Sequence, residues 1–561
     1  MKHSKPLVSL LVLVLAFAFL VASLSAVQSR MNAIRIQQEL TDTEPLENAP
    51  PLVAFTTVAL GGFRGLVADF LWLRSQRMQD LGNYFETVQL ASWITKLQPR
   101  FTAASCFLAW NMAYNVSVTF NRPEDRWRWV QRGIELIRDE ALNYNPSDPE
   151  LFHQLGWIYQ HKVGKDLDDA NRYYKTQMAW EMMRVFGPVV QGRARDGSFP
   201  SSTERWHRIA SGALTPAKLA AQIGEEKYAA FAKILARQGE EGKGWTFDDF
   251  ERKFRESPDG MIPEIVREEI VDLGIVIPVD LALRHRWLRN HYRLKPELVA
   301  HINRTFGDLD WRLPEAHAIY WAVRGGEEWR KSEDEFKALQ CDRMIFQSLS
   351  DAFKGGSLVV MEVDKIEVLE MRPNLNVAEF CRKAYEDAEE RHGESTITAA
   401  YGNFLVDAVV YFYKSGFRAE AKKYFGIGRK RYESRFQGDL DTFAVKELEE
   451  DIKTMSYNQG QSTVQGYLIY SCFALANRNY DECAAYERTA KSVYDKYHQD
   501  IGDTKIRRGL PPYDQMKGNV ITYCLDTFPP ELATVLKAEL DAEEARRKQN
   551  TPPEDKKPGS P

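Results

Sequence analysis

The longest hydrophobic pattern in the 561-residue chain is an uncharged run close to its first residue. The segment LVSLLVLVLAFAFLVASLSAV, residues 7–27, holds 21 residues without a charged side chain and follows Lys2 and Lys5. A helix of this length is roughly 30 Å long, the thickness of the hydrocarbon core of a bilayer. Because positive charge before a span favours the cytosolic side, we expect residues 1–28 to form a cytosolic tip and a transmembrane signal anchor. Removal of the segment as a cleaved signal peptide is the alternative.

A second apolar stretch, PLVAFTTVALGGF, covers residues 51–63 and ends before Arg64. It is short for a membrane span and predicts a buried helix. Between the two apolar stretches, residues 29–54 include TDTEPLENAPP, whose prolines and acidic side chains are typical of an exposed linker.

Apolar residues recur at helical spacing in PELFHQLGWIYQHK, which begins at Pro149. Phe152, Leu155 and Tyr159 fall on one stripe of a helix. Gly156 lies beside this stripe, where the missing side chain lets a neighbouring helix approach closely. The pattern therefore predicts a helix that packs against another helix.

Two histidines in the same stretch raise the alternative of a metal or catalytic site. His153 and His161 are eight residues apart, which places them about 80° from one another around a helix. Metal-ligand pairs on one helix are instead separated by three or four residues, as in HExxH. We therefore interpret the stretch as a packing helix with polar residues on its surface.

This helix resembles the first helix of a tetratricopeptide repeat, because its aromatic, Leu-Gly and tyrosine positions match that motif. It departs from the motif by an insertion after His161, which moves Ala170 two places late. Further units precede it and recur near the C-terminus. The residues expected to pack the repeats are Gly82, Tyr84, Pro99, Phe152, Leu155, Gly156, Tyr159, Gly416, Ala421 and Phe425.

The resemblance implies an all-α fold, a solenoid of stacked helical hairpins. It places N-terminal repeats at residues 55–186 and C-terminal repeats at 313–500. The segment GGFRGLVADFLW at 61–72 is also similar to the opening of uncharacterised bacterial membrane-anchored repeat proteins, a likeness that implies no activity.

Three parts of the chain lack the repeat pattern. Residues 187–312 predict a helical insertion, and LVVMEVDKIEVLEM at 358–371 predicts a β-hairpin that turns at Asp364 and Lys365. Residues 501–540 predict a C-terminal helical segment. The charged, proline-bearing residues 541–561 predict a disordered tail.

Composition and motifs narrow the classes of function. A net charge of −5 and the lack of a nucleic-acid-binding motif argue against nucleic acid as a partner. Six dispersed cysteines without a CxxC pair argue against structural zinc. No HExxH, Walker or nucleophile-elbow motif occurs, so we expect neither an enzyme nor a cofactor, and a small-molecule ligand is not favoured.

One basic segment keeps an alternative open. RHRWLRNHYRLK at 284–295 offers Arg284, Arg286, Arg289 and Arg293 for an anionic ligand. An anion-binding site or an envelope enzyme in the 187–312 insertion is therefore the alternative function. A solvated helix face paired with nearby acidic residues is the competing interpretation of the arginines.

The main expectation is a membrane-anchored, periplasm-facing scaffold that binds a protein or peptide partner in a cell-envelope assembly, such as export, pilus or surface-polymer machinery. Tetratricopeptide repeats, by resemblance, bind partners on the face formed by their first helices. On this basis Asn111, Gln154 and Gln160 are expected to be exposed there and to contact the partner.

Overall fold

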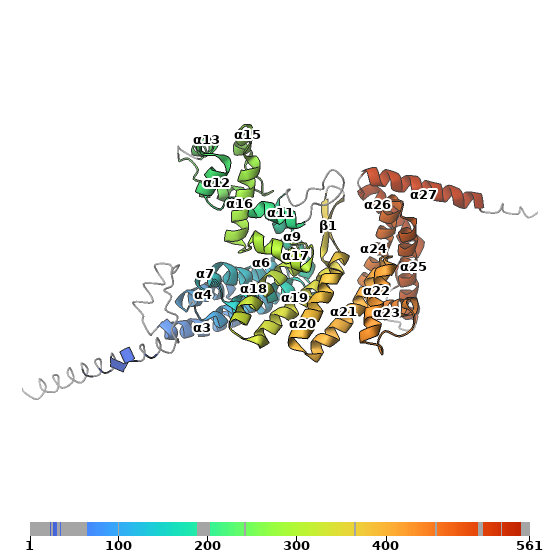
Figure 1. Ribbon diagram of the computed structural model, residues 1–561, viewed down its shortest axis with the longest axis horizontal. Helices are drawn as coiled ribbons and strands as arrows, with labels where there is room; N and C mark the ends of the chain where they lie inside the picture. Colours follow the sequence, from blue (N-terminus) through green and yellow to red (C-terminus); the bar gives the residue numbers. More distant parts are fainter. Residues whose placement is uncertain are drawn as a thin grey trace, which may run out of the picture.

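The structure is a computed structural model that describes residues 64–98, 100–187, 202–239, 243–363, 366–454, 457–502, 509–528 and 530–550, with a few positions between 19 and 34. The described chain is mostly helical (Figure 1). The predicted span at 7–27 and the linker lie outside the described residues, apart from those few positions. No described helix is long and apolar enough to cross a bilayer.

The N-terminal part consists of helices joined by short turns. Three of them widen at their C-terminal ends into π-helical segments: α5 continues as η2, α6 as η4 and α8 as η5. The elements are α3 (Arg64–Asp80), α4 (Tyr84–Leu97), α5 (Thr102–Asn111), η2 (Met112–Val116), η3 (Ser117–Thr119), α6 (Pro123–Glu135), η4 (Leu136–Ala141), α7 (Leu142–Tyr144), α8 (Pro149–Trp157), η5 (Ile158–Val163) and α9 (Asn171–Phe186).

The predicted stripe on the helix that begins at Pro149 is buried. Phe152, Leu155 and Tyr159 all lie in the main hydrophobic core. Asp148 starts this helix, because its carboxylate accepts hydrogen bonds from the backbone amides of Glu150 and Leu151. The helix then packs not on its sequence neighbour but on α18 (Pro314–Lys331), well over a hundred residues further along.

The chain makes an excursion between these two packed helices. It contains α11 (Ser202–Ala210), α12 (Pro216–Ile223), α13 (Glu225–Ala236), α14 (Phe247–Glu256), α15 (Glu264–Asp272), α16 (Val276–His291) and α17 (Pro296–Phe306). Helices α11 and α17 pack together at its base, while α12, α13 and α15 form the tip that projects away from the body (Figure 1). The helical insertion predicted at 187–312 therefore corresponds to a projecting part of the molecule.

After the excursion, the chain returns to helices packed side by side. A β-hairpin forms at the predicted place: β1 pairs antiparallel with β2, and Ser357 lies opposite Arg372. Its expected turn at 364–365 lies outside the described residues. The elements are α19 (Glu335–Gly355), β1 (Ser357–Val363), β2 (Ile366–Arg372), η6 (Leu375–Val377), α20 (Ala378–His392), α21 (Ser395–Lys414), α22 (Arg418–Arg431) and α23 (Leu440–Thr454).

The last helices have a hydrophobic core of their own. They are α24 (Tyr457–Ala476), α25 (Tyr480–Gly502), α26 (Tyr513–Thr527) and α27 (Pro530–Asn550). Their core extends from Val464 to Leu536, whereas the main core extends from Ala91 to Ala444. The prediction of a disordered tail from residue 541 is wrong for 541–550, because α27 continues through them; residues 551–561 lie outside the described part. None of the six cysteines, Cys472 and Cys483 included, forms a disulfide.

The residues expected to pack the repeats occupy different environments in the structure. Gly156 is a contact point: a Cβ built there would lie 2.6 Å from the Met344 sulfur and 3.3 Å from the Ala318 carbonyl oxygen. Gly82 and Gly416 instead occupy turns with positive φ, which other residues rarely adopt. Ala421 and Phe425 are buried, Tyr84 is half-buried, and Pro99 lies outside the described residues.

Candidate functional site

A row of aromatic rings crosses the N-terminal helices. Trp72 on α3 lies 5.1 Å from Phe107 on α5, measured between ring centroids. Trp110 and Tyr114 stack at 5.7 Å one turn further along the same helix. We call the set the aromatic ladder, and its members are Trp72, Phe107, Trp110, Tyr114, His161 and Trp157.

The far end of the ladder lies on the helix that contains the two histidines. The His161 ring stacks on Trp157 at 4.6 Å and lies 5.7 Å from the Tyr114 ring. Tyr114 Oη lies 3.2 Å from His161 Nδ1, within hydrogen-bond distance. Phe107 is exposed and the other members are half-buried, so the ladder is partly open to solvent on three helices, α3, α5 with η2, and α8 with η5.

Two π-helical segments position the middle of the ladder. Tyr114 lies in η2 and His161 lies in η5. A π turn holds more residues than an α turn, so it rotates the side chains that follow it, and such turns are frequent at functional sites. The extra residues expected after His161 fall in η5 and in the turn that precedes α9.

A row of amides runs beside the ladder. Gln79 Nε2 donates to Asn111 Oδ1 over 3.3 Å, and Asn115 Nδ2 donates to the same oxygen over 2.8 Å. Asn115 is exposed, whereas Asn111 is only 3% exposed. The expectation that Asn111 is exposed is therefore wrong, because it holds α3 and α5 together from the inside.

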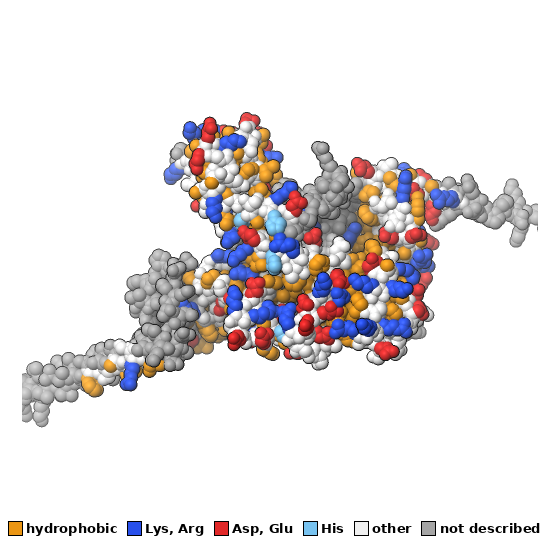
Figure 2. Space-filling model, viewed as in Figure 1, with side chains coloured by type: hydrophobic (Ala, Val, Ile, Leu, Met, Phe, Trp, Pro, Cys, Tyr) orange, Lys and Arg blue, Asp and Glu red, His pale blue; other side chains and the backbone are white. Residues whose placement is uncertain are grey.

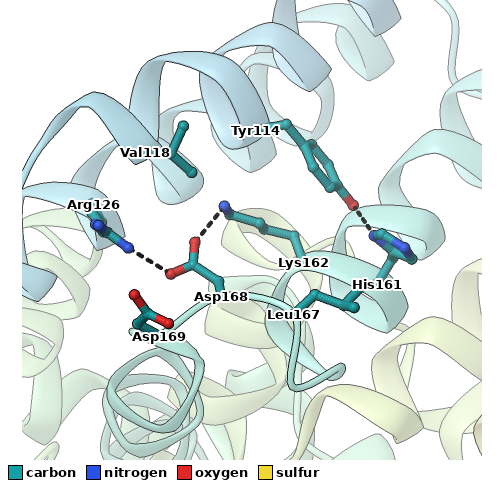
Figure 3. Close-up of a pocket in the computed structure, with 8 residues that line it drawn as sticks. All are labelled: Tyr114, Val118, Arg126, His161, Lys162, Leu167, Asp168 and Asp169. Atoms are coloured by element: carbon teal, nitrogen blue, oxygen red, sulfur yellow. Dashed lines mark hydrogen bonds and ion pairs between the residues drawn. The ribbon is translucent and has the colours of Figure 1, made fainter.

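At Tyr114 and His161 the ladder borders a surface pocket of about 360 Å³ (Figure 3). Figure 3 shows the Lys162 and Arg126 side chains converging on Asp168. Lys162 Nζ lies 2.6 Å from Asp168 Oδ2, and Arg126 Nη1 lies 2.9 Å from Oδ1. The remaining lining residues are Val118, Leu167 and Asp169.

The surroundings shift the pKa values of three pocket residues, Asp168, His161 and Tyr114. Burial would raise the pKa of Asp168, but hydrogen bonds from Lys162 and from the Ala170 amide outweigh it and hold the pKa at about 2. Burial lowers the pKa of His161, helped by the charges of Lys165 and Lys162, and burial raises the pKa of Tyr114. With a pKa of about 2, the Asp168 carboxylate stays ionised near neutral pH.

Gln154 and Gln160 occupy other places than expected. Gln160 is 4% exposed, and its amide donates to the Met344 carbonyl oxygen over 3.2 Å and to Ser348 Oγ over 3.1 Å. It therefore joins its helix to α19 and cannot contact a partner. Gln154 is half-buried, with its amide nitrogen shielded from solvent. The predicted exposure is wrong for Gln160, because it follows Gly156 by four residues and so lies on the helix face that packs against Met344.

Two of the four candidate anion-binding arginines are already bound within the protein. Arg284 is fully buried, where its guanidinium donates to the carbonyl oxygens of Arg184, Val185 and Gly260. Arg286 contacts the carboxylates of Asp248 and Glu251. Their predicted availability to an anion is wrong, because the projecting helices supply their counter-charges.

The other two arginines of the set lie nearer the surface. Arg289 is partly exposed, with Glu297 at 3.6 Å, and Arg293 has a positive φ and contacts Asn143. The structure therefore does not bring the four arginines together into one site. Among the described residues, no group of histidine, cysteine and carboxylate side chains could hold a metal ion.

The ladder is the feature that sequence reasoning missed, although its signal is present. Phe107, Trp110 and Tyr114 are spaced by three and four residues, so a helix must place them on one face. Trp157 and His161 are likewise four apart. The pairing of Tyr114 with His161 across two helices carries no such signal. No family model and no curated protein matches the chain in comparisons with known proteins.

Proposed function

We propose that this protein is a membrane-anchored, periplasm-facing helical scaffold of tetratricopeptide-like hairpins. It binds an extended segment of a partner protein in a cell-envelope assembly, such as export, pilus or surface-polymer machinery. The aromatic ladder is the binding surface, and the pocket beside Tyr114 and His161 receives one side chain of the partner. The repeat resemblance and the uncharged run at 7–27 supply the scaffold and the anchor in this proposal.

The observation that carries the proposal is the aromatic ladder itself. Its rings span α3, α5 and the helix formed by α8 and η5, so a bound segment would cross three helices. Aromatic rings offer a large, rigid contact area that loses little conformational entropy on binding. The exposed amide of Asn115 beside the rings can hydrogen-bond an extended backbone. Such grooves depend on a few aromatic anchors among many weaker contacts.

The alternative site in the 187–312 insertion receives less support. Arg284 and Arg286, the two arginines nearest its centre, neutralise and fasten the insertion's own helices. An anion would have to displace these internal partners, which costs several kcal/mol. The proposal therefore assigns the arginines to folding and the ladder to binding.

A site-specific cross-link in the native cell tests the proposal. A photo-reactive amino acid replaces Phe107, an exposed member of the ladder, in the full-length protein. The matched control replaces Phe336, which is 71% exposed on α19 and outside the ladder. We expect one discrete protein adduct from position 107 and none from position 336.

A second variant ties the adduct to the ladder. Trp110→Ala removes the neighbouring ring, so the adduct at position 107 should fall at least several-fold while the thermal melting temperature stays within a few degrees. No adduct at 107, or an adduct that Trp110→Ala leaves unchanged, contradicts the proposal.

A further inference from the structure

The outward side of α3 is apolar where it faces solvent. Leu66, Phe70 and Leu73 are 65%, 64% and 69% exposed. Their spacing of four and three residues puts them on one stripe of the helix, which we call the α3 stripe. Exposed apolar side chains scattered singly are ordinary, but three adjacent ones on one helix face mark a surface that contacts something other than water.

The α3 stripe does not pack on the main core, because α3 contacts the core through its opposite side. Ala68 is buried there, and Leu71 and Trp72 pack against the main core. The first half of α3 thus carries apolar side chains on both sides, with the exposed Asp69 next to the α3 stripe. One side is covered by protein, so the other side requires a second apolar environment.

The position of α3 in the chain indicates which environment this is. α3 is the first helix whose bounds the structure gives. It follows the apolar residues 51–63, and the predicted linker at 29–54 lies between these residues and the predicted membrane span. It lies at one edge of the molecule (Figure 1), and Figure 2 shows hydrophobic side chains at the surface there. The 36 residues between the predicted span and α3 allow α3 to reach the bilayer surface.

The exposed charges near the α3 stripe are of both signs, because Asp69 and Asp80 lie beside it and Arg77 lies on it. Arg77 follows Leu73 by four residues, so it continues the α3 stripe as an exposed cation. Helices that lie in the plane of a membrane combine an apolar stripe with flanking arginine or lysine, which reaches the phosphate level. Leu66, Phe70 and Leu73 supply the inserted part, and Arg77 supplies the headgroup contact.

We propose that α3 lies in the interface of the bilayer that holds the anchor, with its stripe inserted among the lipids. The proposal rests on the anchor of the proposed function. It has a consequence for binding, because Trp72 at the start of the aromatic ladder belongs to the same helix. The ladder then begins at the membrane surface, and the partner presents a segment that lies close to the membrane.

Spin labels on the full-length protein test the proposal in vesicles of phosphatidylethanolamine and phosphatidylglycerol. Single cysteines replace Phe70 and Leu73, with Phe336 as the exposed aromatic control outside α3. Cys483→Ser removes the native thiol that is not fully buried. We expect labels at 70 and 73 to collide with dissolved oxygen and to lose access to a water-soluble nickel complex, whereas the label at 336 keeps that access.

Two results would overturn the proposal. Labels at 70 and 73 that meet the nickel complex as readily as the label at 336 would show a face in water. Labels shielded from both oxygen and nickel would show that protein covers the stripe, either residues 51–63 or a partner. An alkaline carbonate wash separates this failure from failure of the anchor: a protein that the wash releases has no span, whatever its labels report.

Discussion

The Nζ of Lys162 lies 2.6 Å from Oδ2 of Asp168, and both side chains are only 5% exposed. The carboxylate also accepts hydrogen bonds from the Ala170 amide and from the hydroxyl of Tyr174. Arg126 completes the set from α6. Through this one carboxylate, α6, η5 and α9 are joined where the aromatic ladder ends, so the shape of the pocket depends on it.

We predict that Asp168→Asn destabilises the protein by about 3 kcal/mol or more, because it leaves the Lys162 charge buried without its partner. Urea denaturation of the full-length protein in detergent measures the loss. The matched control is Asp166→Asn, two residues away, whose carboxylate is 87% exposed and lies 3.3 Å from Lys175. The control should change stability by less than about 1 kcal/mol. Equal losses in the two variants would contradict the structural role of Asp168.

The same carboxylate makes stability depend on pH in the acid range. Its pKa is about 2 in the folded protein and about 4 in an unfolded chain. A lowered folded pKa stabilises the protein above the unfolded value, and the stabilisation disappears as the pH falls from about 4 to about 2. We expect wild type to lose about 2 kcal/mol more than Asp168→Asn over this interval. If wild type and Asp168→Asn lose the same free energy of unfolding between pH 4 and pH 2, this pH dependence does not come from Asp168.

Gly156 provides a test of the packing between α8 and α18. A Cβ there would press on the flexible end of Met344 and approach the Ala318 carbonyl oxygen and Trp321 Cβ, each at 3.3 Å. We expect Gly156→Ala to cost about 1–3 kcal/mol and Gly156→Leu more, since backbone and Cβ atoms cannot move aside. The control is Gly426→Ala on α22, where nothing lies within 4 Å and Ala should stabilise by up to about 1 kcal/mol. A harmless Gly156→Leu would refute the contact.

The local periodicity of the sequence was sufficient to predict secondary structure and which face of a helix is buried. The stripe of Phe152, Leu155 and Tyr159 is buried, and the β-branched run at 358–371 forms a hairpin. Both patterns depend on residues a few positions apart, so the sequence displays them directly. The same holds for the mostly helical class of the fold.

Partners distant in sequence could not be predicted in this way. In the sequence Gln160 resembles a surface residue. In the structure its amide donates hydrogen bonds to Met344 and Ser348 of α19. In the sequence Arg284 resembles part of a basic patch. In the structure its guanidinium donates hydrogen bonds to carbonyl oxygens of α9 and of the loop before α15. The π turns add a second difficulty, because they change which side chains face inward without changing the composition of the helix.

Arg284 separates the folding and binding interpretations of the basic segment. Its guanidinium makes hydrogen bonds of 2.8–3.1 Å to Asp280 and to three backbone carbonyl oxygens. Arg284→Lys cannot reach all of these acceptors, so we expect a loss of about 3 kcal/mol or more in urea denaturation. Arg289→Lys, on the same helix and partly exposed, should lose less than about 1 kcal/mol. If the Arg284→Lys protein is as stable as wild type, Arg284 is not needed for folding, and the result supports its role in anion binding.

We expect the free energy of unfolding to fall as the pH rises toward neutral, because the buried carboxyl group of Glu315 in the first turn of α18 opposes ionisation. Its Oε2 is buried and has no hydrogen-bond partner among the described residues. Burial raises the pKa of the carboxyl group to about 7, with Asp351 adding to the rise and the charges of Lys175 and Lys165 opposing it. A folded pKa above the unfolded value of about 4.3 means that stability is full below that value and falls until the pH passes about 7.

Glu315→Gln removes this titration while keeping the shape of the side chain. At pH 8 the variant should be more stable than wild type by up to about 3 kcal/mol, and the advantage should vanish near pH 4. Buried neutral histidines such as His317 also titrate in this range, but they are common to both proteins and cancel in the difference. Urea denaturation of both proteins at intervals from pH 4 to pH 8 measures the difference. If the two stabilities stay parallel across that range, Glu315 is ionised in the folded protein, and its carboxylate has a partner that relieves its burial.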